Sequence, residues 1–176
     1  LYGQANPSLT QTISGFVNNE NLASSGVSGT ALGSTSATAT TNVGSAAIVA
    51  STSGLSAGNY DFTASSTDGT LTIDKAHLTV TADNKTRLYG QANPTLTTTV
   101  SGFVNGESAS TAAGFAGAGT ASTTAVAATN VGTATITAGA GTLAATNYDF
   151  ANLTDGTLTI DKAHLTVTAD NQSRLY

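Results

Sequence analysis

A long exact internal repeat constrains this chain more than any other feature of its sequence. Residues 67–84, which read Thr-Asp-Gly-Thr-Leu-Thr-Ile-Asp-Lys-Ala-His-Leu-Thr-Val-Thr-Ala-Asp-Asn, recur letter for letter as residues 154–171 (154 − 67 = 87 residues apart). On both sides of Asp74-Lys75-Ala76, apolar residues alternate with small polar ones, which is typical of half-buried strands. The repeat therefore predicts a strand, a short joint and a second strand, with the joint lying where one repeat ends and the next begins.

Other segments follow nearly the same period. Leu1–Pro7 returns at Leu88–Pro94, and Leu175-Tyr176 begins the motif a third time. In the middle of the repeat the offset is 88, so that Asn42 matches Asn130. Because insertions are tolerated in loops, the change of offset places one loop before this segment and another after it.

Alternation and turn residues predict further strands and a core. A short helical turn after Asn105-Gly106-Glu107 is a further expectation, since Ala is frequent there, although recurring Gly argues against a long helix. The predicted strands are 9–13, 37–40, 45–50 and 59–62 in the first repeat and 96–100, 124–127, 133–138 and 147–150 in the second. The residues expected to be mostly buried are Leu71, Ile73, Leu78, Val80, Leu158, Ile160, Leu165, Val167, Phe16, Phe103, Tyr60, Phe62, Tyr148 and Phe150.

The composition excludes several classes of function. The 176 residues contain no Cys, which rules out disulfides and thiolate chemistry. Charged residues are 9% of the chain and the net charge is −5, so a nucleic-acid partner is not expected, because phosphate binding needs clustered Lys and Arg. No apolar run is long enough for a transmembrane helix and no signal peptide is recognised. We expect the chain to be a fragment of a longer, exported protein.

The repeats can be divided into domains in two ways. If the unit begins with the Leu-Thr-Val-Thr-Ala strand, residues 1–76 form a repeat that lacks its first strand, 77–163 a complete repeat, and 164–176 the first strand of a third. In the other phase, 1–88 and 89–176 are two self-contained domains. In the first phase, residues 164–176 could complete the sheet of 1–76 in another copy by strand addition, because an unpaired sheet edge invites pairing.

Six motifs in a fixed order resemble a known family. They are Leu-Thr-Val-Thr-Ala-Asp-Asn, Arg-Leu-Tyr-Gly-Gln-Ala-Asn-Pro, Val-Ser-Gly-Phe-Val-Asn-Gly-Glu, Thr-Asn-Val-Gly-Thr-Ala-Thr-Ile-Thr, Asn-Tyr-Asp-Phe and Gly-Thr-Leu-Thr-Ile-Asp-Lys-Ala, and they cover nearly all of residues 78–163. This set resembles the MBG (YGX-type) repeats and related YDG repeats of large bacterial surface adhesins. The resemblance implies an all-β fold of tandem small β-domains, β-grasp-like or an Ig-like sandwich, in an elongated repeat array. It carries no catalytic residues, and residues 108–128 depart from the charged sequence usual in the family.

Candidate metal ligands are few. His77 and His164 are the only histidines, one in each repeat, and Asp74 or Asp83 could join His77 at a metal. We expect both histidines to be solvated strand residues instead. Asp68, Asp74, Asp83 and Asn84 could offer oxygen ligands to Ca²⁺, but Asp68 and Asp83 are better explained as turn formers. We therefore predict no metal site and no cofactor.

The sequence gives little support for catalysis, crosslinking, glycosylation or sugar binding. No Ser-His-Asp triad or paired carboxylates are indicated, so no catalytic residue is predicted. A Lys–Asn crosslink is not expected, because each available lysine is expected to be exposed. Three asparagines fit the Asn-x-Ser/Thr pattern of glycosylation sites. The tyrosines could stack on sugars, although we expect them in the core. These candidates are Lys75, Lys85 and Lys162; Asn84, Asn152 and Asn171; and Tyr2, Tyr89 and Tyr176 with the pairs Tyr60/Phe62 and Tyr148/Phe150.

The sequence thus predicts a non-enzymatic structural repeat of an exported bacterial adhesin. Its expected role is to form a stalk or fibre for adhesion at the cell surface or in the biofilm matrix, with self-association through strand addition between copies. The alternative is a glycan- or mucin-binding module that acts by multivalency. We expect an extracellular location, no nucleic-acid partner and no membrane insertion.

Overall fold

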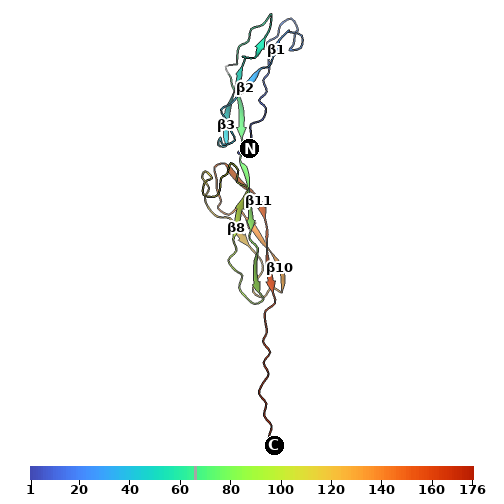
Figure 1. Cartoon of the computed structure of the whole chain (residues 1–176), viewed down its shortest axis with the longest axis vertical. Helices are drawn as coiled ribbons and strands as arrows, with labels where there is room; N and C mark the ends of the chain where they lie inside the picture. The colour runs from blue at the N-terminus through green and yellow to red at the C-terminus, as the bar shows by residue number, and fades with distance from the viewer. Residues whose placement is uncertain (66) are drawn as a thin grey trace. The chain divides into compact units, whose positions relative to one another are not determined.

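The computed structural model describes residues 1–65 and 67–176, and within these residues it contains strands and no helix (Figure 1). The all-β prediction is therefore confirmed. The strands are β1 (Ser28–Gly29), β2 (Leu32–Ser34), β3 (Gly44–Ser51), β4 (Leu55–Ser56), β5 (Gly69–Ile73), β6 (Ala76–Ala82), β7 (Lys85–Leu88), β8 (Thr98–Ser101), β9 (Thr120–Ser122), β10 (Gly132–Gly139), β11 (Tyr148–Thr154) and β12 (Gly156–Asp161).

The chain divides into two compact units that cut across the sequence repeats. Unit 1 contains residues 1–77, 103–115 and 144–149. Unit 2 contains residues 78–102, 116–143 and 150–176. Two pieces of the second repeat are therefore part of unit 1. Each unit is described by itself below.

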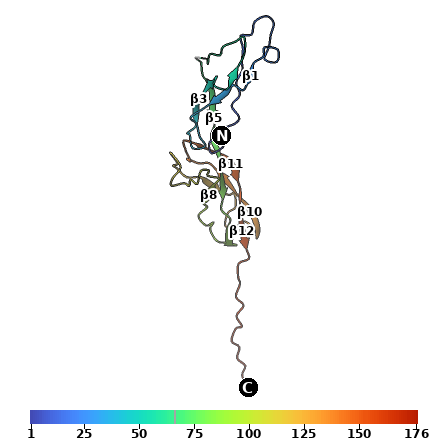
Figure 2. The same ribbon diagram turned by 45° about the horizontal axis from the view of Figure 1, so that its top comes forward.

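Unit 2 holds a four-stranded sheet with the order β7-β12-β10-β9. β12 pairs antiparallel with β10, with Leu158 opposite Ala134, and parallel with β7 on its other side. Figure 2 shows β10 and β12 running side by side. A second sheet, with the order β11-β6-β8, lies mostly in the same unit. β6 is its central strand, so both edges of β6 are satisfied by backbone pairing.

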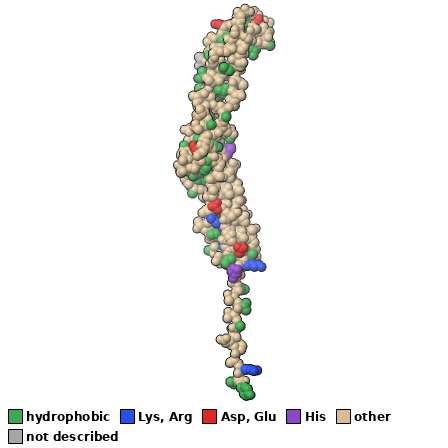
Figure 3. All heavy atoms as spheres, viewed as in Figure 1, with side chains coloured by type: hydrophobic (Ala, Val, Ile, Leu, Met, Phe, Trp, Pro, Cys, Tyr) green, Lys and Arg blue, Asp and Glu red, His purple; other side chains and the backbone are tan. Residues whose placement is uncertain are grey.

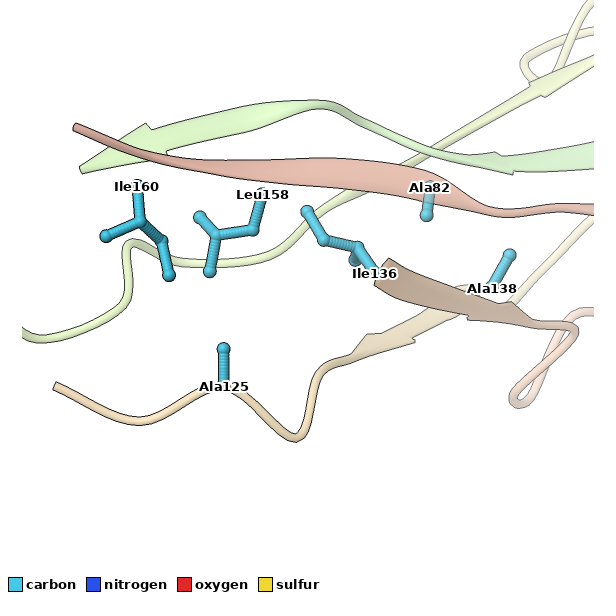
Figure 4. Packing of buried hydrophobic residues seen from close by; sticks show 6 residues of the cluster. All are labelled: Ala82, Ala125, Ile136, Ala138, Leu158 and Ile160. Atoms are coloured by element: carbon cyan, nitrogen blue, oxygen red, sulfur yellow. The ribbon is translucent and has the colours of Figure 1, made fainter. Parts of the chain in front are cut away.

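The core of unit 2 lies on the inward face of these strands. Apolar residues alternate along β6 and β12, so one face of each strand is buried, as period-2 patterning predicts. Figure 4 shows Leu158 and Ile160 pointing toward Ala125, with Ala82 facing Ala138. The buried cluster consists of Ala82, Ala125, Ile136, Ala138, Leu158 and Ile160.

Unit 1 repeats only part of this arrangement. Its three-stranded sheet has the order β2-β3-β5, which matches β9-β10-β12, and Gly44 faces Ile73 as Gly132 faces Ile160. A small two-stranded sheet, β1-β4, is also present. The described segments of the first repeat that correspond to β8 and β11 are not strands, and the positions that correspond to β6 and most of β7 would precede Leu1.

Several strand predictions are correct and several are wrong. The strands predicted at 45–50, 96–100, 133–138 and 147–150, and those in the repeated stretch up to Asp161, are found with shifted ends. The segments 9–13, 37–40, 59–62 and 124–127 are not strands, and neither is 164–170, although its letters are those of β6. The reason is pairing: 9–13 and 59–62 lack the central strand that β8 and β11 share. After Asn105, Ala112 N donates to Ser108 O at 2.8 Å, a single turn that does not continue as a helix.

The burial predictions divide in the same way. Ile73, Leu78, Val80, Leu158, Ile160 and Tyr148 are buried. Leu71, Phe16, Phe103, Tyr60, Phe62 and Phe150 are only half-buried. The prediction for Leu165 and Val167 is wrong, since they are 93% and 96% exposed. A side chain is buried only where a strand has neighbours, and residues 162–176 form no strand.

The visible surface is built mainly from uncharged groups. Figure 3 shows few Lys, Arg, Asp and Glu side chains on the face in view, most of which is uncharged. This agrees with a charged fraction of 9%. Hydroxyl and amide groups must therefore supply most of the polar contacts described next.

Candidate functional site

A single carboxylate in unit 1 joins the two sequence repeats. Glu107, from the second repeat, accepts a hydrogen bond from the Tyr2 hydroxyl at 2.9 Å and another from the Tyr148 hydroxyl at 2.5 Å. Tyr2 is 4% exposed and Tyr148 is 1% exposed. Hydrogen bonds to a charged acceptor are stronger than neutral ones, so this group ties the start of the first repeat to the second. We call the contacts between the repeats in unit 1 the repeat junction.

Aromatic rings surround this carboxylate. The ring of Tyr148 meets those of Tyr2 and Phe103 edge to face, with centroids 5.6 and 5.5 Å apart. Burial, together with the hydrogen bond to Glu107, raises the pKa of Tyr148 to about 12. The backbone N–H of Val104 also donates to the Tyr148 hydroxyl, at 3.1 Å. The phenol is therefore held neutral and fixed in direction.

A buried amide forms the second part of the junction. Asn147 is 1% exposed; its Nδ2 donates to Asn42 Oδ1 at 2.9 Å, and its Oδ1 accepts from Val43 N at 3.1 Å. Its backbone carbonyl accepts from Ala76 N at 3.0 Å. One residue of the second repeat thus satisfies three groups of the first.

Exposed polar contacts complete the junction. His77 Nδ1 lies 2.9 Å from both carboxylate oxygens of Asp149, and Lys75 Nζ donates to the carbonyl of Ala145 at 3.0 Å. His77 was expected to be a solvated strand residue, and its partner Asp149 was missed. Glu20 and Glu107 were missed as well, although they occupy equivalent positions in a chain with few acidic residues.

The residues on each side of the repeat junction have counterparts in the other repeat. Among the described residues, the two sets of counterparts do not contact each other as the junction residues do. Tyr60 donates to Glu20, and its ring packs edge to face on Phe16, as Tyr148 does with Glu107 and Phe103. Tyr89 corresponds to Tyr2: its N–H donates to Asp161 O at 2.8 Å, as that of Tyr2 does to Asp74 O. However, Tyr89 is 43% exposed.

A cavity of about 480 Å³ lies in unit 1 between segments of the first repeat that correspond to β8 and β11. Its walls include residues 10–16 and 60–65, the counterparts of β8 and β11, together with Ile48, Ala50 and Gly69. In the second repeat the space between the matching strands is filled by β6, whose Leu78 and Val80 are fully buried. We call this cavity the strand groove.

A buried arginine near the end of β7 makes hydrogen bonds to two other segments of the second repeat. Arg87 is 5% exposed; its Nε donates to Asn93 Oδ1 at 2.7 Å and its Nη2 to Val126 O at 2.6 Å. In the first repeat, Asn6 corresponds to Asn93 and Thr38 to Val126. Both help to line a second cavity of about 290 Å³. We call this second cavity the arginine pocket.

The sequence-predicted ligands for metal do not converge. Asp83 accepts from Thr97 Oγ1 at 2.5 Å and from Thr99 Oγ1 at 2.8 Å, and these hydrogen bonds lower its pKa. Asn84 Oδ1 accepts from Thr157 N at 2.7 Å. Asp68, Asp74 and His164 are exposed. Among the described residues no group of three or more His, Asp or Glu side chains is placed to hold a metal ion.

The remaining candidates are spread over the surface. Lys75 and Lys162 are exposed as expected, while Lys85 is half-buried in β7. Asn152 and Asn171 are exposed, and so is Tyr176. The described part of the chain holds no helix long and apolar enough to cross a membrane.

The fold and the junction define an all-β protein of tandem repeats. The family model described as "MBG domain (YGX type)" matches residues 1–72 and 78–159. The chain therefore belongs to the MBG domain family, with two repeats in tandem, as the resemblance predicted. Repeats of this family are of the kind found in adhesin-like surface proteins. No curated protein and no solved structure matches the chain.

Proposed function

We propose that this chain is a non-enzymatic structural repeat of an exported bacterial adhesin, and that it forms part of a stalk for adhesion at the cell surface or in the biofilm matrix. The observation that carries the proposal is the repeat junction, in which Glu107 binds the hydroxyls of Tyr2 and Tyr148. A stalk must pass tension from each repeat to the next, and a buried tie between repeats resists separation better than a flexible linker does.

The chemistry of the buried polar groups supports a structural role. The buried polar side chains of the described residues are Ser25, Arg87 and Asn147. Each makes a hydrogen bond to a nearby backbone or side-chain group. These groups hold the fold together, and none is poised against a nucleophile or a paired carboxylate, which is why we propose no enzymatic activity.

The test is mechanical. The chain is tethered by its two ends and pulled in an optical trap, and Tyr2→Phe is compared with Tyr89→Phe. Tyr2→Phe should lower the force at which the first structural step occurs, because one hydroxyl bond to Glu107 is lost. Tyr89→Phe should leave the force unchanged. Equal traces for both variants and the parent would refute the tie.

A second candidate function is glycan binding, which one observation favours. Tyr89 is 43% exposed although its counterpart Tyr2 is buried, and an exposed ring can stack on a sugar. Glycan-array binding that disappears in Tyr89→Ala would support this function. An array without signal would leave the stalk as the function of the chain.

A further inference from the structure

The turn that carries Glu107 contains Asn105-Gly106, the one place in this sequence where an asparagine is followed by a glycine. Both residues have positive φ, 54° for Asn105 and 71° for Gly106, and Glu107 N donates to Val104 O at 2.9 Å. Positive φ at both central positions is the conformation of a type I′ turn, which Asn-Gly favours. Asn105 and Gly106 are exposed. The pair is therefore open to water, although its neighbour Glu107 belongs to the repeat junction.

We propose that Asn105 is a site of spontaneous chemical modification, at which water converts the asparagine into isoaspartate and thereby loosens the repeat junction. This inference goes beyond the proposed function, because it concerns the chemistry of one turn and does not depend on what the parent protein adheres to. The only reactant besides the chain itself is water.

The conversion of Asn105 has two balanced steps. In the first, the backbone nitrogen of Gly106 loses its proton and attacks Cγ of Asn105. A C–N bond forms, the bond from Cγ to Nδ2 breaks, and ammonia leaves with the proton, so that a five-membered succinimide ring remains. In the second, water opens the ring: attack at the former backbone carbonyl gives isoaspartate, and attack at Cγ gives aspartate. Neither step needs an oxidant or an enzyme.

Gly106 makes the first step easier here than at the other asparagines. Asparagine is one of the labile residues of proteins, and its lability depends on the residue that follows it. Glycine has no side chain to shield its nitrogen, and it reaches backbone conformations that other residues avoid. In the described part of the chain, no group accepts a hydrogen bond from the N–H of Gly106. The nitrogen is therefore available to attack, and the exposed turn admits the water that opens the ring.

The hydroxyl of Tyr148 bridges the two ends of this turn. It donates to Glu107 at 2.5 Å and accepts from the backbone N–H of Val104 at 3.1 Å. Isoaspartate routes the main chain through its Cβ and Cγ, so one extra carbon enters the turn between Val104 and Glu107. The lengthened turn no longer presents both groups to one hydroxyl. The modification therefore disturbs the carboxylate that ties the two repeats together.

The side chain of Asn105 belongs to the junction as well. Its Nδ2 donates to the carbonyl of Ala39, in the first repeat, at 3.2 Å. Both products lose this amide and gain a carboxylate, which has no hydrogen to donate and repels a carbonyl oxygen. The new charge also lies two residues from Glu107, and like charges repel. The contacts between the repeats are thus weakened from two sides.

The first repeat has the same turn without the reactive pair. Asn18 and Asn19 have φ of 56° and 58°, and Glu20 N donates to Val17 O at 3.0 Å. Asn19 stands where the second repeat has Gly106, and its side chain shields the attacking nitrogen. Gly106→Asn should therefore keep the turn and remove the glycine, which makes it the matched control for the reaction.

The first experiment measures the modification site by site. The full chain is incubated in warm, mildly alkaline buffer and digested at intervals at low pH, where the reaction is slow. Mass spectrometry with electron-transfer fragmentation then separates isoaspartate from aspartate. Asn105 should convert several times faster than any other asparagine, with isoaspartate in excess, and Gly106→Asn should suppress the conversion. Conversion of Asn105 at the rate of the other asparagines, or equal conversion in Gly106→Asn, would overturn the proposal.

The second experiment measures the effect on the repeat junction. Aged and fresh parent chains are compared by thermal unfolding and by hydrogen–deuterium exchange. The aged chain should lose several degrees in its first transition and exchange faster in residues 103–115 and 144–149. Asn105→Asp supplies the charge without the extra carbon, so its loss should be smaller. Gly106→Asn should be as stable after ageing as before. An aged parent chain with the stability and exchange of the fresh one would overturn the proposal.

Discussion

The Tyr148 hydroxyl donates a 2.5 Å hydrogen bond to Glu107, and Tyr2 donates to the other oxygen of the same carboxylate. Two tyrosines from different repeats thus share one acceptor in unit 1. Two of the predictions that follow concern this junction.

High pH should weaken the junction. The pKa of Tyr148 is raised from an ordinary value of 10.0 to about 12, so the folded state favours the neutral phenol. The stabilisation is complete below pH 10 and is lost as pH rises toward 12, and two pKa units amount to roughly 1–3 kcal/mol after allowance for screening. Urea unfolding at pH 8 to 11 measures this. The decline should be smaller in Tyr148→Phe, and identical slopes would contradict the assignment.

Asn147→Leu should destabilise unit 1. The substitution leaves Val43 N–H and the Asn42 side chain without the partner seen here, and an unsatisfied buried group costs about 1–3 kcal/mol. Asn59→Leu is the matched control, because Asn59 is the exposed counterpart in the first repeat and should shift stability by less than about 0.5 kcal/mol. Thermal melts of the two variants give the comparison; equal shifts would count against the buried amide.

Ile160→Ala should destabilise unit 2. Ile160 is 1% exposed in the cluster with Leu158 and Ala125, and removing its methyl groups leaves a cavity worth roughly 2–4 kcal/mol. Leu153→Ala serves as control, since Leu153 is 48% exposed on β11. Denaturant titration should separate the two variants clearly, and a midpoint for Ile160→Ala within error of the parent chain's would contradict its place in the core.

Gly156→Ala should be costly where Gly69→Ala is harmless. The added Cβ would lie 2.3 Å from Ala82 O, so β6 and β12 would have to move apart, at a cost of roughly 1–3 kcal/mol. The same change at Gly69 meets only an ordinary contact. Melting temperatures of the two variants at low protein concentration test this. An unchanged melting temperature for Gly156→Ala would contradict the close approach of β6 to β12 at Gly156.

Calcium and EDTA should leave the melting temperature unchanged. Asp83 is occupied by the hydroxyls of Thr97 and Thr99, and Asn84 by the N–H of Thr157. These oxygens would have to give up protein partners to bind an ion. The measurement is differential scanning calorimetry with Ca²⁺ or EDTA added to about 5 mM. This concentration is on the order of the dissociation constant of a weak extracellular Ca²⁺ site or above it. A rise of many degrees with Ca²⁺ would show that these oxygens bind metal instead.

Local alternation was enough to predict β3, β5, β6, β10 and β12, because each has neighbours on which its apolar face can pack. Alternation was not enough at residues 164–170. Leu78 and Leu165 have the same neighbours in sequence, yet one is fully buried and the other is 93% exposed. Burial of a strand depends on partners far away in the chain, and local letters do not record them.

The candidate site shows the same limit. The tyrosines were expected in the core. Tyr2 and Tyr148 are buried, but the expectation is wrong for Tyr89, which is 43% exposed, and for Tyr176, which is exposed. The shared acceptor of Tyr2 and Tyr148, Glu107, was not recognised, because a single carboxylate in a Gly-rich stretch looks like a solvated loop residue. The sugar-stacking and metal hypotheses came from residue type alone. Only the three-dimensional arrangement shows that Asp149 meets His77 and that Glu107 meets two phenols.

The residues of both junction faces occur in each repeat, and this has a consequence for the gene. Tyr2, Asn42 and Lys75 reappear as Tyr89, Asn130 and Lys162, while Glu107, Asn147 and Asp149 have the counterparts Glu20, Asn59 and Asp61. An in-frame gain or loss of 87 residues between the identical stretches 67–84 and 154–171 would therefore add or remove one whole repeat and keep matching residues on both sides of each repeat junction. The number of repeats could then differ between variants of the protein while the residues of each remaining junction stay the same.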